Sequence, residues 1–157
     1  MRVYLAGPDV FHPDAAARAA RMKAACAAHG LEGIFPLDPP PCPLPEGPAW
    51  RRIYTANEAH LRAADALLAN ITPFRGPSAD VGTAWEMGFM RALGRPVLAW
   101  TEEERDYAAR IAPDGLLVED FGLADNLMLE GGAVAVLRGP GAFEAALRRL
   151  AALARRG

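Results

Sequence analysis

Two acidic residues in the middle of the chain, Asp80 and Glu86, are placed to do chemistry together. They stand in the segment Asp-Val-Gly-Thr-Ala-Trp-Glu, where Asp80 is a good helix N-cap and Glu86 follows nearly two turns later. Both carboxylates can therefore face one crevice. Gly82 leaves the start of this helix open to a ligand, and the first-turn amides offer donors to sugar or phosphate oxygens.

A plainer interpretation exists for each of these acids. Asp80 serves well as a cap alone, and a glutamate on a helix is mostly exposed to solvent. The neighbours of Glu86 argue against full exposure, because it shares an inward stripe with Thr83 and Met90. The large apolar residues around it are Trp85, Met87, Phe89 and Met90. A carboxylate in such surroundings is partly desolvated, which is costly unless the group is used or paired.

The elements that must position these acids alternate between strand and helix. Short apolar runs predict strands at residues 1–6, 31–37, 66–71, 97–100 and 133–137. Helical periodicity with N-cap and glycine stop signals predicts helices at residues 15–29, 50–64, 81–93 and 142–156. This order is typical of an α/β protein with a doubly wound parallel sheet and helices on both faces, and we expect residues 1–157 to form a single domain.

Ligands of such sheets bind beyond the carboxyl ends of the strands. The loops to inspect are therefore residues 7–11, the segment from Asp38 onward, and residues 72–86. Residues 38–48 hold too many prolines for regular structure, and a loop of this length in a compact domain is usually a functional flap.

The composition limits the kinds of molecule that the protein is expected to bind. With 17 basic and 19 acidic residues the net charge is −2, so nucleic acid polymers and anionic membranes are not expected to bind. The chain shows no signal peptide and no run of about 18 apolar residues, and we expect a cytoplasmic protein. Cys26 and Cys42 lack the clustering of a zinc or redox site.

Several segments recur together in one known family. In order along the chain they are Tyr4-Leu5-Ala6-Gly7-Pro8 with Phe11, Phe35-Pro36-Leu37-Asp38, Asn57, residues 64–70, Pro73-Phe74-Arg75-Gly76, Asp80-x-Gly-Thr-Ala-x-Glu86-x-Gly88 and Asp125-Asn126. A lone Gly-Thr-x-x-Glu also occurs in phosphoribohydrolases related to cytokinin activation. The ordered set is specific, and in it the sequence resembles the nucleoside 2-deoxyribosyltransferases.

The resemblance implies a role for individual residues. Glu86 matches the family's nucleophile, and Asp80 matches its second acidic residue, which contacts the deoxyribose or the leaving base. The family is a flavodoxin-like homo-oligomer whose sites are completed by a neighbouring subunit, through an asparagine that matches Asn126. Seen alone, Asn126 is a plausible turn or helix cap. Some members carry an aspartate where Asn57 stands, and an amide cannot transfer a proton. Asp80 and Asp38 are then the candidates for the general acid.

The residue types suit cleavage of an N-glycosidic bond by two displacements. A carboxylate near the anomeric carbon stabilises an oxocarbenium-like state and captures it as an ester, while a second acid assists departure of the base. No metal or cofactor is required. The remaining candidates for contacts with substrate are Tyr4, Gly7, Phe11, Asp38, Asn57, Phe74, Gly82 and Asn126. Of these, Tyr4, Phe11 and Phe74 are the candidates to line a base pocket, although core packing explains any single aromatic equally well.

Three functions fit to different degrees. The first is an exchange of nucleobases on 2′-deoxyribonucleosides, a reaction of nucleoside salvage, with small nucleosides and free bases as the only partners besides other subunits. The second is an N-glycosidase that hydrolyses nucleosides or their 5′-monophosphates. In that case residues 75–78 could donate hydrogen bonds to the 5′-phosphate. The third is a nucleotide-sensing module without chemistry, for which Asp80 and Glu86 would be dispensable.

Overall fold

A five-stranded parallel sheet is the framework of the computed structural model, which describes residues 1–155. The strand order β2-β1-β3-β4-β5 is that of a flavodoxin-like, doubly wound sheet, so the expected fold class is confirmed. The strands are β1 (Arg2–Ala6), β2 (Glu32–Ile34), β3 (Ala66–Asn70), β4 (Val97–Thr101) and β5 (Ala135–Arg138).

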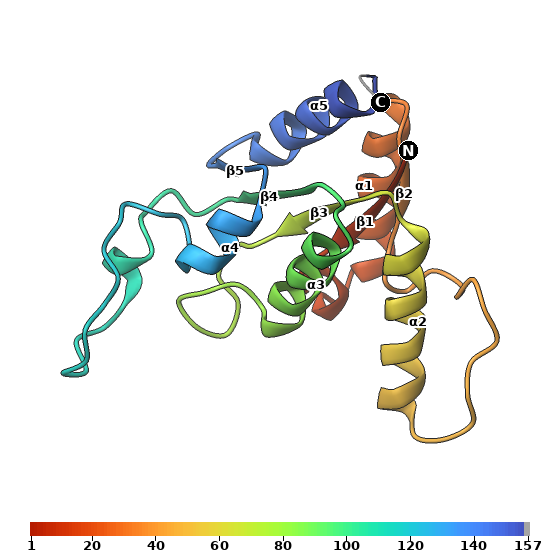
Figure 1. Ribbon diagram of the computed structural model, residues 1–157, viewed down its shortest axis with the longest axis horizontal. Helices are drawn as coiled ribbons and strands as arrows, with labels where there is room; N and C mark the ends of the chain where they lie inside the picture. The colour runs from red at the N-terminus through yellow and green to blue at the C-terminus, as the bar shows by residue number, and fades with distance from the viewer. Residues whose placement is uncertain (156–157) are drawn as a thin grey trace.

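Helices cover both faces of the sheet (Figure 1). The α-helices are α1 (Ala15–Ala28), α2 (Ala49–Ala63), α3 (Val81–Ala92), α4 (Leu127–Gly132) and α5 (Ala142–Ala154), with short 3₁₀ turns η1 (Pro8–Phe11) and η2 (Ala108–Arg110). Helices α1 and α5 pack on one face in one apolar cluster, and α2 and α3 pack on the other face in a second.

Each central strand sends alternate side chains to these two clusters, as a sheet buried on both faces requires. Toward α1 and α5 the strands present mostly large side chains, namely Val3, Leu5, Leu68, Leu98 and Trp100. Toward α2 and α3, at the carboxyl end of the sheet, they present a row of alanines in register: Ala6 opposite Ala69, and Ala69 opposite Ala99. The short alanine side chains let α3 lie close to the strands, with Met87 and Met90 in the same cluster.

Some element boundaries differ from those predicted. Strand β2 ends at Ile34 rather than at residue 37, because a turn closed by the Asp38 amide on the Phe35 carbonyl follows it directly. Strand β5 begins two residues late. Helix α5 is described to Ala154, and the predicted end at Arg156 lies outside the described residues. The short helix α4 was not predicted as a helix.

The proline-rich segment 38–48 has no regular structure, as expected. It is mostly exposed and, in the view of Figure 1, runs along the side of α2 away from α3. Within residues 1–155, no helix combines the length and apolar character needed to cross a membrane.

Candidate active site

Glu86 is joined to the first strand by a hydrogen bond between residues 82 positions apart. The Tyr4 hydroxyl donates to Glu86 Oε1 at 2.8 Å. Tyr4 is fully buried in the cluster beneath α2 and α3, and Glu86 lies on α3 one turn after Thr83, which is also buried. Helix α3 therefore holds the carboxylate against the sheet, while Tyr4 fixes one of its two oxygens.

The surroundings of Glu86 change its acidity. Burial raises the pKa of the Glu86 carboxyl to about 7, the Tyr4 hydrogen bond acts in the opposite direction, and the charge of Asp80 raises it further. Burial also raises the pKa of Tyr4 far above its ordinary value, so Tyr4 remains a donor throughout the physiological range. A partly buried carboxyl whose pKa is raised to near neutral is the kind of group found at functional sites.

Asp80 caps α3 as the sequence predicts. Its Oδ2 accepts from the Thr83 amide at 3.1 Å and lies 3.4 Å from the Thr83 hydroxyl. A Cβ at position 82 would lie 2.9 Å from this same Oδ2, so Gly82 provides room for the capping carboxylate. Within residues 1–155 nothing donates to Asp80 Oδ1, so this oxygen is available to contact a ligand.

A third carboxylate, that of Asp9, was not singled out from the sequence. It is 5% exposed and bound on both oxygens, by the Asn70 side-chain amide at 2.8 Å and the Arg18 guanidinium at 3.0 Å. Gly7 makes this possible: it has φ +151°, and a Cβ there would lie 2.6 Å from Asn70 Cβ. The signal in the sequence was an aspartate in the loop that follows a buried strand, three positions after its end, at the sheet edge where ligands bind.

Phe11 and Phe74 form an aromatic pair across two loops. Phe11 ends the turn after β1, Phe74 lies in the loop after β3, and their rings stack with centroids 5.1 Å apart and planes 12° apart. Phe11 remains 53% exposed. The pair thus lies at the carboxyl end of the sheet, where α3 also begins, with about half of the Phe11 side chain open to solvent.

Asp125 is the second acidic residue whose role the sequence analysis missed. It is 1% exposed and accepts from the Ser78 hydroxyl, from the Ala79 amide at 2.8 Å and from the Asn126 amide at 2.7 Å. Asp125 therefore ties the loop that leads into Asp80 to the beginning of α4. Its place in an Asp-Asn pair was visible, but the partner loop was not.

The remaining residues proposed to contact substrate lie on several different elements. The side chain of Asn126 caps α4 by accepting from the Met128 amide at 3.0 Å, and its amide group donates to Glu119 at 3.2 Å. Asn57, on α2, has a buried Oδ1 to which nothing within residues 1–155 donates. Tyr4 does not expose its ring as a base-pocket lining would, because the ring is part of the core; only its hydroxyl reaches Glu86.

Asp38 is held by the fold itself. The Lys23 ammonium lies 2.9 and 2.8 Å from its two oxygens, and the Phe35 amide donates to Oδ2 at 2.9 Å. Both oxygens are therefore already bound, which suits an anchor for the segment that follows better than a proton donor.

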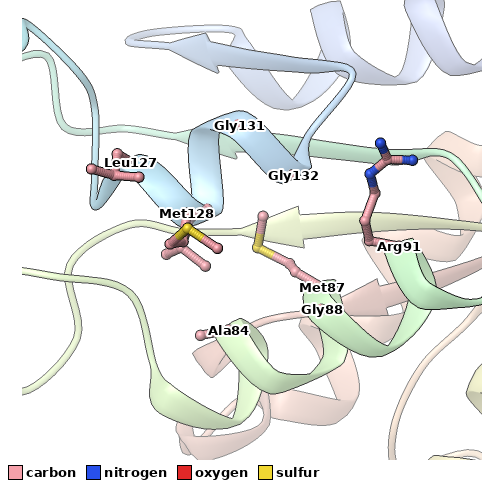
Figure 2. A pocket seen from close by; sticks show the side chains of 9 residues that line it. Ala84, Met87, Gly88, Arg91, Leu127, Met128, Gly131 and Gly132 are labelled. Carbon is pink, nitrogen blue, oxygen red and sulfur yellow. The ribbon is translucent and has the colours of Figure 1, made fainter.

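A pocket of about 540 Å³ lies between α3 and α4 (Figure 2). Met87 and Met128 point into it from the two helices, and Arg91 lies at one end. None of the expected site residues lines this pocket, so it occupies a different face of α3 from Glu86. In the described part of the chain, no three His, Cys, Asp or Glu side chains gather where they could hold a metal ion.

Comparison with protein families gives a match over most of the chain. The model of the family described as nucleoside 2-deoxyribosyltransferase matches residues 3–128, which include both candidate carboxylates. Among solved structures, a 2-desoxiribosyltransferase from Leishmania mexicana is 34% identical, with a TM-score of 0.78 over 96% of this chain and 97% of that one.

Two further relatives are more distant. A 2-deoxyribosyltransferase from Bacillus psychrosaccharolyticus is 22% identical, with a TM-score of 0.57 over 87% of this chain and 85% of that one, a likeness of fold alone. An uncharacterized protein of Schizosaccharomyces pombe is 29% identical over 82% of this chain and 75% of its own length.

Proposed function

Because this chain belongs to the nucleoside 2-deoxyribosyltransferase family, we propose that it exchanges nucleobases on 2′-deoxyribonucleosides through a covalent deoxyribosyl ester on Glu86. The family membership makes it an enzyme of N-glycosyl transfer. The covalent step, the residues that perform it and the balance between transfer and hydrolysis are the proposal.

One observation carries the assignment of Glu86. Its carboxyl group is partly buried, its pKa is raised to about 7, and within residues 1–155 only Tyr4 donates to it, on one oxygen. Tyr4 therefore orients the group and leaves Oε2 as the attacking atom. Burial withdraws water from this oxygen, which makes it a better nucleophile and protects an ester formed on it.

In the first displacement Glu86 Oε2 bonds to C1′ of the sugar while the C1′–N bond breaks. The electron pair of that bond leaves with the base, which takes up a proton or a hydrogen bond as it departs. In the second, a nitrogen of the incoming base bonds to C1′, the ester bond breaks and Glu86 regains its carboxylate. The incoming base gives up a proton to the group that assisted departure of the first base. Two inversions retain the configuration of the nucleoside.

Asp80 is the better candidate for the acid. Its Oδ1 has no partner within residues 1–155, whereas both oxygens of Asp38 are bound by Lys23 and Phe35. Asn57 has a buried acceptor oxygen to which nothing among the described residues donates, which makes it a candidate to accept from an N–H or O–H of the substrate. Asp80→Asn keeps the helix cap, because asparagine caps comparably, and should lower the rate at least about 10²-fold. A mild loss would make Asp80 structural.

Base exchange tests the reaction itself. Deoxyinosine incubated with adenine should yield deoxyadenosine and hypoxanthine with little free deoxyribose, resolved by chromatography. Transfer wins because a stacked base held near the ester reaches C1′ before water does. If free sugar forms as fast as hypoxanthine under saturating adenine, or if deoxynucleoside monophosphates are clearly the better donors, the enzyme is the N-glycosidase instead.

The covalent step has its own test. A 2-deoxy-2-fluoro nucleoside destabilises positive charge at the anomeric carbon and slows breakdown of the ester enough to trap it. Peptide mass spectrometry should then find the sugar on the peptide that contains Glu86. An adduct on another residue would move the nucleophile elsewhere.

We also propose that the working enzyme is a homo-oligomer in which Asn126 completes a neighbour's site. Mixing Glu86→Ala with Asn126→Ala subunits should restore activity, since each supplies the part that the other lacks. Absence of recovery after verified subunit exchange, or an active monomer by light scattering, would contradict a shared site.

A further inference from the structure

Arg75 lies against the aromatic pair formed by Phe11 and Phe74. Its guanidinium carbon is 5.1 Å from the centroid of the Phe11 ring and 4.7 Å from that of Phe74. Contact with two aromatic faces holds a guanidinium in a defined orientation, because the positive charge is attracted to the ring faces. This long side chain is therefore ordered at the open edge of the pair.

The backbone also fixes Arg75. It has φ +55°, and it is the one residue other than glycine with positive φ in the described chain. Glycine adopts positive φ at less cost, but here Arg75, and not the neighbouring Gly76, has this strained backbone conformation. A hydrogen bond from the Phe74 amide to the Ser78 carbonyl, 3.0 Å long, closes the loop around it. The loop thus turns the Arg75 side chain back over Phe74.

The donors of Arg75 are not used by the fold. Within residues 1–155 its guanidinium makes no hydrogen bond or ion pair, whereas Arg18, Arg95 and Arg110 are bound to protein oxygens. A guanidinium has five N–H donors in a rigid fork, suited to two adjacent acceptors in one plane. Arg75 offers this fork beside an aromatic face on which a base can stack.

The edge of a purine decides which bases fit this fork. In a 6-oxopurine, O6 and N7 are adjacent acceptors that an arginine binds together, whereas a 6-aminopurine presents a donor in place of O6. We propose that Arg75 is a specificity-determining residue that selects 6-oxopurines over 6-aminopurines, with the base stacked at Phe11 and Phe74. As a statement about catalysis this rests on the proposed function; as a statement about base binding it does not.

Binding of free bases tests the inference without any chemistry. Titration calorimetry of the wild type with hypoxanthine and with adenine should show tighter binding of hypoxanthine. Arg75→Met keeps an unbranched apolar side chain beside the rings but has no donors, and should lower that preference by about 10-fold or more. Arg75→Lys keeps the charge without the fork and should also lose the preference. Arg148→Gln, an exposed arginine on α5 at the other face of the sheet, is the matched control.

Turnover provides the second measurement. Equal deoxyinosine and deoxyadenosine compete for one acceptor, unsubstituted purine, so that product ratios report relative kcat/KM. An equal loss of kcat/KM for both nucleosides in Arg75→Met would mean that Arg75 only packs against the rings, and it would overturn the inference. An unchanged base preference with loss only of 5′-monophosphate binding would make Arg75 a phosphate ligand. If the wild type binds hypoxanthine through Arg75 yet transfers no sugar, the proposed function fails and this inference stands.

Discussion

The two faces of the sheet are built from the same strands but differ in what they hold. The face under α1 and α5 is filled by large apolar side chains such as Leu5, Leu68 and Leu98. The face under α2 and α3 carries a buried tyrosine, a row of alanines at the carboxyl end of the strands, and a glutamate whose pKa is raised to about 7.

We interpret this difference as one between a face that only stabilises the fold and a face that also carries the proposed nucleophile. Large side chains on the α1/α5 face stabilise the fold by burying apolar area, and these apolar groups require no hydrogen-bond partner. On the α2/α3 face, the alanines allow α3 to approach, and the approach desolvates Glu86, which costs stability. Both clusters therefore stabilise the fold, and the α2/α3 face in addition carries a carboxyl group that is kept there at a cost in stability.

The largest effect should come from Glu86 itself. Glu86→Ala removes the proposed nucleophile and should lower kcat/KM at least about 10³-fold, measured by base exchange. Glu144→Ala, which removes a glutamate from α5 at the other face, is the control and should leave activity unchanged. Full activity in Glu86→Ala would end the assignment of this face as the catalytic one.

Truncation of two neighbouring leucines allows the contributions of the two faces to stability and activity to be compared directly. Leu67 and Leu68 are adjacent in β3 and fully buried, but Leu68 belongs to the α1/α5 face, and Leu67 is in register with Tyr4 on the other. Each truncation to alanine should lower the free energy of unfolding by about 2–5 kcal/mol in urea titrations.

Only the truncation on the α2/α3 face should also affect catalysis. Leu67→Ala loosens the packing around Tyr4 and should lower kcat/KM about 10-fold, since small misplacements of reacting groups are costly. Leu68→Ala should keep kcat/KM within about 2-fold at a temperature where it is folded. Equal losses of activity in both variants would abolish the distinction between the faces.

The cost of burying Glu86 should appear as a dependence of stability on pH. The folded pKa is about 7 and the ordinary value is 4.5, so between these values the folded state holds a proton that the unfolded chain releases. The stability that this group contributes is present below pH 4.5 and is lost as the pH rises through 7. Glu86→Gln cannot titrate, and its advantage over the wild type should grow by about 1–3 kcal/mol from pH 4.5 to 8.

Thermal or urea unfolding of both proteins across that range measures the difference. The other titrating groups are common to the two proteins and cancel in the comparison. A constant difference between pH 4.5 and 8 would mean that the Glu86 carboxyl titrates in the folded protein as it does in water.

The smallest effect concerns the hydrogen bond from Tyr4. That bond lowers the pKa of Glu86, so Tyr4→Phe should raise this pKa further. Because the nucleophile must be ionised, kcat/KM should rise with pH around 7 in the wild type and at higher pH in the variant. A pH–rate profile that moves to lower pH would show that Glu86 donates the proton in this bond.

Much of the fold follows from short-range patterns in the sequence. The apolar runs of β1, β3 and β4 predict buried strands, Asp80 predicts the beginning of α3, and Gly30 and Gly94 mark helix ends with positive φ. These features depend on residues within a few positions of one another. The inward stripe of α3 likewise indicates that Glu86 is partly buried.

Contacts between distant residues needed the tertiary structure. The bond from Tyr4 to Glu86, the pair of Asp9 with Asn70, and the hold of Asp125 on the loop before α3 each join strands or loops far apart in the chain. Strand order and register decide which side chains meet, and no local pattern encodes them.

The sequence alone therefore determined most of the elements and the fold class, and it singled out the two carboxylates of the proposed mechanism. Only the tertiary structure decided which groups surround these carboxylates. It showed that Asp38 is bound to Lys23 and Phe35, while no group among the described residues donates to Asp80 Oδ1. It also showed that Tyr4 holds Glu86 rather than lining a pocket. The physical reason is that desolvation and hydrogen bonding depend on everything packed around a group, most of which comes from elsewhere in the chain.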